Sequence, residues 1–210
     1  MNKKISALLL AGAMMLSLAA CGAKEEAPAP APSAPSTSTS TEATGEVAGL
    51  TDPIAEGPAL VTSGGQSADY QMIATVMGKV GMDYTVANLC TSADLGDAKT
   101  LIVVVGGSSK GLGAAGIDAD GELARLTELL DGAKSAGLTV IAMHTGGEAR
   151  RGELSDKFIT PIFEKADYAI VVTSGDEDGL MSGICASKGI PMDGIASISE
   201  VATVLPAAFK

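Results

Sequence analysis

The sequence predicts a single three-layer α/β domain, in which helices cover both faces of a mostly parallel sheet of five to six strands. From about residue 58 onward, short apolar runs of strand length alternate with longer segments whose apolar residues recur at helical spacing. One run, Leu101–Val105, is apolar at every position, which is typical of a central strand buried on both faces. Strands and helices that alternate in this way form a parallel sheet between two helical layers.

The first half of the domain is expected to hold three strands and one long helix. Within 69–80, the apolar residues Tyr70, Ile73, Met77 and Val80 fall on one helical face, and Gly81 follows as a residue that favours helix termination. In chain order, the expected elements are strand 59–62, helix 69–80, strand 84–89, a turn or short helix at 92–97, and strand 101–105.

The second half begins with a glycine-rich segment, 106–117, that we expect to be a loop. Asp118 is placed to cap the helix that follows it, Pro161 is expected to kink or split a later helix, and Ser199 is expected to cap the last one. The further elements are helix 118–136, strand 139–143, loop 144–152, helix 155–165, strand 168–172, a helix from Asp176 or Asp178 to Lys188, edge strand 191–197, and helix 199–209. The default order of the first five strands is the flavodoxin-like 2-1-3-4-5.

Residues 1–57 are expected to lie outside this domain. After a basic start, the uncharged apolar run Ile5–Leu18 is shorter than the about 20 residues that a membrane-spanning helix needs. It ends in small residues followed by Cys21, a pattern that resembles the lipobox of bacterial lipoproteins, in which the cysteine carries the lipid. We therefore interpret 1–20 as a lipoprotein signal peptide, 21–57 as lipidated Cys21 with a disordered Ala/Pro/Ser/Thr-rich stalk, and 58–210 as the domain. The alternative is an ordinary secretory signal with an incidental cysteine.

Charge and composition exclude several partners. The chain carries 14 basic and 25 acidic residues, and the formal charge of −11 becomes −13 when Lys3 and Lys4 leave with the signal. A chain this acidic repels nucleic acid. It has no Trp, three Tyr and three Phe, so aromatic stacking surfaces have little material. One His and the domain's two Cys, Cys90 and Cys185, fit no standard zinc spacing, so neither a metal nor another cofactor is expected. The two cysteines could pair or remain buried thiols.

Polar loops follow several of the expected strands and predict a binding site. In parallel sheets, ligands bind beyond the carboxyl ends of the strands, where the strand order reverses. Glycines there let backbone N–H groups approach a ligand, hydroxyls add donors, and basic side chains favour an anion. The predicted ligand-binding residues are Gly64, Gly65, Ser67, Gly106, Gly107, Ser108, Ser109, Lys110, His144, Arg150 and Arg151. The alternative is that the glycines only turn the chain, while both arginines pair with Glu148 and Glu153.

Two motifs in the segment after Val105 suggest other chemistry. Gly111–Gly116 matches the dinucleotide fingerprint G-x-G-x-x-G, but it does not turn directly from a first strand into a helix. Gly107–Gly111 matches G-x-S-x-G, the nucleophile elbow, and His144 is the chain's one histidine. A serine hydrolase that uses Ser109 or Ser108 with His144 is therefore an alternative hypothesis, although no acid clearly orients the histidine.

Two long segments carry a resemblance to a known family. They are 101–118, LIVVVGGSSKGLGAAGID, and 143–156, MHTGGEARRGELSD. From Pro58 onward, the chain resembles an uncharacterised family of bacterial lipoproteins that share a domain of unknown function. The resemblance implies an α/β lipoprotein domain and no particular activity.

The sequence favours a binding module over an enzyme. We expect an extracytoplasmic lipoprotein, held by Cys21 to the cell membrane or an outer envelope membrane, that binds a small anionic ligand and could hand it to a membrane protein. The alternatives are the serine hydrolase and an envelope protein-interaction domain without a small-molecule ligand.

Overall fold

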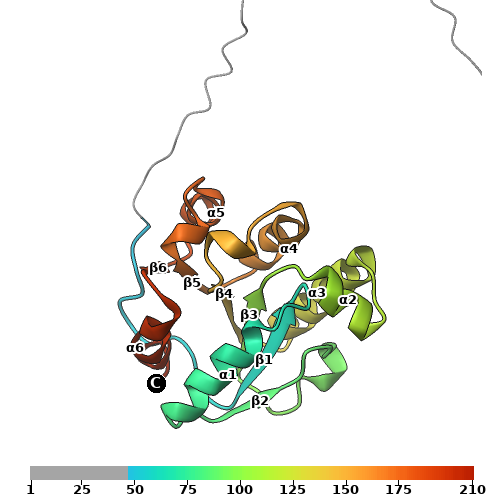
Figure 1. Cartoon of the computed structure of the whole chain (residues 1–210). Coiled ribbons are helices and arrows are strands. Elements are labelled where there is room, and N and C mark those ends of the chain that lie inside the picture. Colours follow the sequence, from blue (N-terminus) through green and yellow to red (C-terminus); the bar gives the residue numbers. More distant parts are fainter. Residues whose placement is uncertain (1–46) are drawn as a thin grey trace, which may run out of the picture. The chain divides into compact units, whose positions relative to one another are not determined.

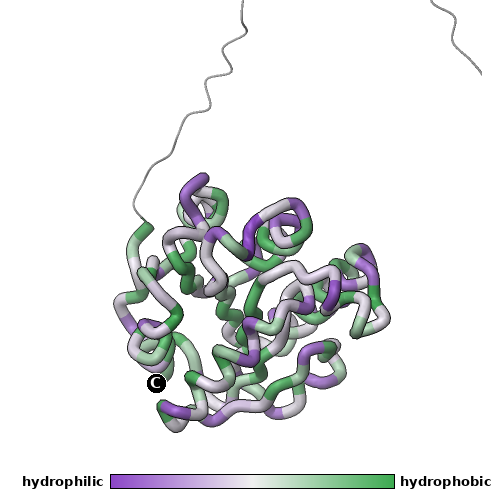
Figure 2. Tube along the Cα trace, in the orientation of Figure 1, coloured by the Kyte–Doolittle hydropathy of each residue, from purple (hydrophilic) through white to green (hydrophobic). Residues whose placement is uncertain are grey.

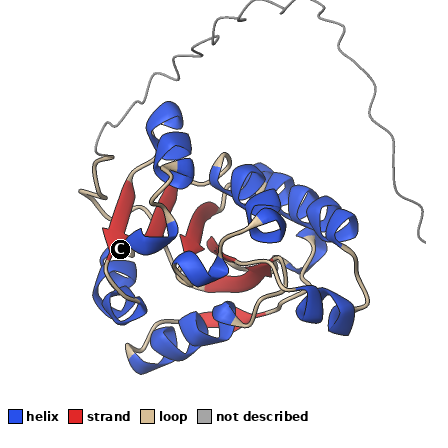
Figure 3. Ribbon diagram, turned by 45° about the horizontal axis from the view of Figure 1, so that its top comes forward, coloured by secondary structure: helices blue, strands red, loops and turns tan. Residues whose placement is uncertain are grey.

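The computed structural model describes residues 47–210, and the predictions for the signal peptide and for Cys21 lie outside them. Six parallel strands form one sheet in the order β2-β1-β3-β4-β5-β6 (Figure 1, Figure 3). The strands are β1 (Ala59–Gly64), β2 (Tyr84–Val86), β3 (Thr100–Val105), β4 (Thr139–His144), β5 (Tyr168–Val172) and β6 (Met192–Ile195). The α/β class is confirmed, and the sixth strand extends the expected order.

Helices cover both faces of the sheet. Helices α1 and α6 pack on one face, and α3, α4 and α5 pack on the other. The α-helices are α1 (Asp69–Lys79), α2 (Ser109–Ala115), α3 (Ala119–Ser135), α4 (Glu153–Phe163), α5 (Leu180–Lys188) and α6 (Val201–Ala207). Four short 3-10 helices complete the described part: η1 (Ser92–Asp94), η2 (Glu148–Arg150), η3 (Thr173–Gly175) and η4 (Ile198–Glu200).

The core is aliphatic and divided by the sheet. Along β3, Leu101, Val103 and Val105 face the α3 side, whereas Ile102 and Val104 face the α1 side. All five side chains are fully buried, as the alternation of side chains across a strand predicts for a sheet covered on both faces. Figure 2 shows the hydrophobic colour gathered along the strands and polar colour on the outer loops.

Three expected elements differ in the structure. Segment 106–117 is not one loop: it contains α2, whose first turn is capped by the Ser108 hydroxyl, which accepts the Gly111 N–H at 3.0 Å. Helix α4 continues through Pro161 without splitting, and the proline removes only the one helical bond that its own N–H would have made. Ser199 does not cap α6, because it lies inside η4, and Glu200 occupies the cap position.

Residues 47–57, which the sequence analysis assigned to the stalk, belong to the packed domain. Ala55 is fully buried, and the N–H groups of Ile54 and Ala55 donate to Ala208 O. Ala48 O accepts the Met192 N–H of β6, so this segment also covers that edge of the sheet. The side chains of Val47, Leu50, Ile54 and Ala55 also pack on the core, but they show no strand or helix periodicity, so the sequence gives no sign of this packing.

Asp118 caps α3 as expected, accepting the Gly121 N–H at 2.7 Å. Cys90 and Cys185 are buried free thiols, and burial raises the pKa of both, to about 11 for Cys185. Within 47–210, no helix combines the length and the apolar character needed to cross a bilayer.

Candidate functional site

The carboxyl edge of the sheet contains the topological switch point. The neighbouring strands β1 and β3 send their connections to opposite faces, β1 into α1 and β3 into α2 and α3. The loops that follow diverge there, and a crevice between them is where α/β sheets bind ligands.

The loop after β1 is held in one conformation by a buried network. Gln66 has φ +61, the one positive φ at a non-glycine residue in the described part of the chain. Its side-chain nitrogen donates to Asn88 O and to the Glu122 carboxylate. Glu122 is fully buried and is paired with Arg125 at 2.7 Å. Neither Gln66 nor this ion pair was predicted as part of the site. The only signal in the sequence was a charged pair three positions apart on α3.

Gly106 and Gly107 pack too closely against other segments to line an open site. A Cβ on Gly106 would lie 2.7 Å from Ser67 Oγ and 3.0 Å from Asp69 Oδ2. Gly107 donates its N–H to Ser155 Oγ at 2.8 Å, at the start of α4. The glycines are therefore needed for close packing of three segments.

Arg150 pairs with a carboxylate from the first turn of α1. Its Nε lies 3.1 Å from Asp69 Oδ2, and Asp69 also accepts the Ser67 hydroxyl at 3.0 Å. Asp69 is 6% exposed. The loop after β4 and the start of α1 are thus brought together, and the arginine neutralises a buried charge there.

Arg151 holds a different pair of loops. Its guanidinium contacts the carboxylates of Asp156 and Asp178, both at 2.8 Å, and donates to Gly175 O at 2.6 Å. Hydrogen bonds from this guanidinium lower the pKa of Asp178 to about 2. The two arginines do pair with carboxylates, as the alternative interpretation expected. Their partners are Asp69, Asp156 and Asp178, and not Glu148 and Glu153.

His144 is fully buried at the end of β4. Its Nε2 donates to Arg150 O at 3.4 Å, whereas Nδ1 has no hydrogen-bond partner among the described residues. Burial lowers the pKa of this imidazole, so the neutral form is favoured. No hydrogen bond joins His144 to Ser108 or Ser109 in the part of the chain that the structure covers. Although α2 begins directly at Ser109, as an elbow requires, neither serine is bonded among the described residues to the base that a serine nucleophile needs.

A hollow of about 440 Å³ opens at the switch point, beside these packed loops. One wall is the start of α1, a second is the end of the β2 segment, and a third is α2. Its lining residues are Gln66, Ser67, Ala68, Tyr70, Gln71, Asn88, Leu89, Gly111, Ala114 and Ala115. None of them is charged, and Ser67 is the one that belongs to the predicted ligand-binding set.

Lys110 lies at the rim of this hollow. It is exposed and forms no salt bridge in the described region. It precedes Gly111 and lies one turn before Ala114, and both of those residues line the hollow. The sequence prediction was therefore correct that the loops after β1, β3 and β4 meet. It did not find the opening, which lies toward β2 rather than toward the arginines.

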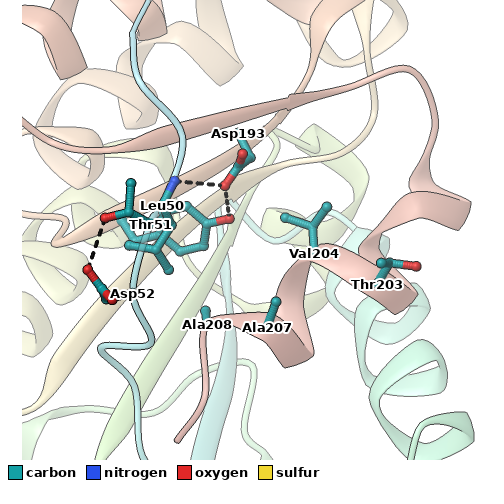
Figure 4. A pocket seen from close by; sticks show the side chains of 9 residues that line it. Leu50, Thr51, Asp52, Asp193, Thr203, Val204, Ala207 and Ala208 are labelled. Carbon is teal, nitrogen blue, oxygen red and sulfur yellow. Dashed lines mark hydrogen bonds between the residues drawn. The ribbon is translucent and has the colours of Figure 1, made fainter.

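A second hollow, of about 260 Å³, lies near the start of β5, between segment 50–52, β6 and α6 (Figure 4). Asp193 Oδ2 accepts the Tyr168 hydroxyl at 2.5 Å and the Leu50 N–H at 3.2 Å. Burial and this carboxylate raise the pKa of Tyr168. These bonds fasten segment 47–57 to the sheet, which gives the Asp193 carboxylate a structural role.

Comparison with known proteins identifies the family. A family model for a domain of unknown function, DUF6305, matches residues 56–209. The chain belongs to this family. A search of the curated proteins gives no match.

Two solved structures resemble the DUF6305 chain distantly. One is a psychrotrophic esterase, EstA from Pseudoalteromonas sp., inhibited by monoethylphosphonate, with 12% identity, a TM-score of 0.30, and coverage of 69% of this chain and 81% of the esterase. The other is TesA, with 13% identity, a TM-score of 0.30, and coverage of 64% and 77%. Similarity at this level carries no information about activity.

Proposed function

We propose that this DUF6305 domain is a binding module that captures a small anionic ligand in the hollow at the switch point. The observation that carries the proposal is the position of the hollow. It lies at the carboxyl edge of a parallel sheet, between connections that leave toward opposite faces, where such folds bind ligands.

The chemistry of the walls supports an anion with a small uncharged remainder. Of the first backbone N–H groups of α1, that of Asp69 donates to Ser67 Oγ at 3.4 Å and that of Gln71 donates to Ala68 O at 3.0 Å. The start of this helix therefore offers the Tyr70 N–H and a partial positive charge to an anion. Asp69 would oppose an anion there, but Arg150 neutralises its carboxylate. Lys110 adds an exposed cation next to the lining residues of α2, while Leu89, Ala114 and Ala115 provide apolar surface.

The lipid anchor belongs to the same proposal. Residues 1–21 are a short apolar signal that ends in Cys21. This pattern supports attachment of the mature chain to a membrane outside the cytoplasm. A module held there could deliver its ligand to a neighbouring membrane protein. Metabolic labelling with a palmitate analogue tests this point. Wild-type chain should take up label and Cys21→Ser should not, and equal labelling of the two would refute the anchor.

A thermal-shift screen with a blocking variant tests ligand binding. The full chain, purified in nonionic detergent, is heated with inorganic phosphate, acetate or succinate. A ligand present at about 100 times its Kd should add about 2.7 kcal/mol of stability. Ala114→Leu places a larger side chain in the hollow and should abolish the shift.

The matched control is Ala124→Leu, because Ala124 is exposed on α3 and does not line the hollow. It should retain the wild-type shift. If no probe stabilises the wild-type chain, or if Ala114→Leu responds as the wild type does, the proposed function is wrong.

A further inference from the structure

A buried ion pair lies directly beneath the hollow and is bonded to its floor. The Glu122 carboxylate accepts the Gly65 N–H at 2.9 Å and the Gln66 side-chain amide at 3.1 and 3.2 Å. The carboxylate also accepts hydrogen bonds from Nε and from a terminal nitrogen of Arg125, at 2.8 and 2.7 Å. Gly65 and Gln66 lie in the loop after β1, so Glu122 of α3 fixes that loop.

Arg125 extends the same network to the second wall. Its terminal nitrogens donate to Cys90 O at 2.8 Å and to Ser63 O at 2.7 Å. Asn88, which lines the hollow, accepts a bond from the Gln66 side-chain nitrogen at its backbone oxygen and donates its own side-chain nitrogen to Gln66 Oε1. The ion pair therefore joins the end of the β2 segment to the loop after β1, in addition to the bonds that the Ala87 N–H donates to Val61 O and Thr62 Oγ1 donates to Asn88 O.

Gln66 transmits this restraint to the third wall. Its left-handed backbone is unfavourable for a residue with a Cβ, and the bonds from its side chain hold it there. Its carbonyl group lies against Gly111 of α2 so closely that a Cβ on Gly111 would overlap the oxygen. The conformation of Gln66 thus determines the position of α2 relative to α1.

We propose that Glu122, with Arg125, is a positioning residue for the ligand: its carboxylate fixes Gln66, and Gln66 sets the width of the hollow. This inference rests on the proposed function. A buried ion pair adds little net stability compared with apolar side chains of the same size, whereas its directional bonds specify one geometry. A purely stabilising role and a positioning role therefore predict different behaviour when the pair is replaced.

Three variants of the full chain in nonionic detergent separate these roles. Glu122→Gln removes the charge and cannot accept from all of the present donors. The double variant Glu122→Leu, Arg125→Leu replaces the pair with apolar side chains. Val201→Ala, in a buried position on α6 across the sheet, is the control for lost stability alone.

Two readouts are used: amide hydrogen exchange at Gly65 and Ser67, and the Kd for inorganic phosphate. Glu122→Gln should speed exchange at both amides at least tenfold and weaken phosphate binding at least tenfold. Val201→Ala should leave both near wild-type values at temperatures well below its Tm. The double variant should regain the wild-type Tm. It should regain neither the protection of the two amides from exchange nor the affinity for phosphate.

Wild-type exchange at Gly65 and Ser67 in Glu122→Gln would overturn the inference. Recovery of protection and affinity together with Tm in the double variant would also overturn it, because stability alone would then explain the effect. If the wild-type chain binds no phosphate, the proposed function fails on that readout, while the exchange rates still decide whether Glu122 fixes the floor of the hollow.

Discussion

Two glycines of α2 that lie two positions apart should respond oppositely to the same substitution. A Cβ on Gly111 would overlap Gln66 O and lie 2.9 Å from Gln66 C, which is backbone and cannot rotate away. A Cβ on Gly113 would meet nothing within 4 Å. Both residues lie within the helix, so replacing either with alanine removes the same helical penalty of about 1 kcal/mol.

The magnitudes follow from these surroundings. Gly113→Ala should stabilise the domain by about 1 kcal/mol, which raises Tm by about 2–4 °C for a domain of this size. Gly111→Ala gains the same propensity but incurs overpacking of about 1–3 kcal/mol or more, because the backbone itself must shift. Because the overlap is with backbone, the cost should lie at or above the upper half of that range, about 2–3 kcal/mol. The net effect should then be a loss of about 1–2 kcal/mol, or about 2–8 °C in Tm.

Urea and thermal unfolding of both variants, followed by circular dichroism, measure this difference. Gly111→Ala should also reduce any ligand-induced shift, because α2 must move relative to Gln66. If Gly111→Ala were as stable as Gly113→Ala, then α2 would not rest on Gln66 as the structure shows, and the wall of the hollow would be misplaced.

Three further variants address the loops after β4 and β5. Arg151→Lys should cost about 1–2 kcal/mol in urea unfolding, because lysine cannot contact Asp156 and Asp178 with a fork of donors; an unchanged midpoint would contradict this. Because the pKa of Asp178 is lowered to about 2, its contribution is present above about pH 4 and lost as pH falls toward 2. Its exposed carboxyl limits that contribution to below about 1 kcal/mol, and Asp178→Asn should lack this part of the acid dependence. Burial lowers the pKa of His144, so wild-type stability should decrease as pH falls below about 6.5, and His144→Gln should remove that component; an identical pH profile for the variant would refute the assignment.

The alternation of apolar runs was sufficient to predict the class of fold and the positions of most strands. Leu101–Val105 shows why: a fully apolar run of five residues has few places other than the centre of a covered sheet. The α2 helix was missed because four glycines within 106–113 lower helical propensity. The Ser108 cap and the packing of Gly111 on Gln66 offset that cost, and the packing depends on a residue more than 40 positions away.

The candidate site was predicted in part for a similar reason. Glycines and basic residues after parallel strands correctly indicated loops that meet, because the carboxyl ends of parallel strands share one edge. Whether a basic side chain faces a ligand or a carboxylate depends on tertiary contacts, and the sequence holds no local sign that Arg150 would meet Asp69. Nothing local in the sequence distinguishes Glu122 and Arg125 from an exposed helical pair, although the structure buries both side chains.

An NMR titration of the ¹⁵N-labelled chain with inorganic phosphate tests the location of the site most directly. We predict that the largest amide shifts fall at 67–71 and 110–115, around the hollow between α1 and α2. Shifts centred on Arg150 and Arg151, or no shift at millimolar phosphate and carboxylate, would contradict a binding site at the switch point.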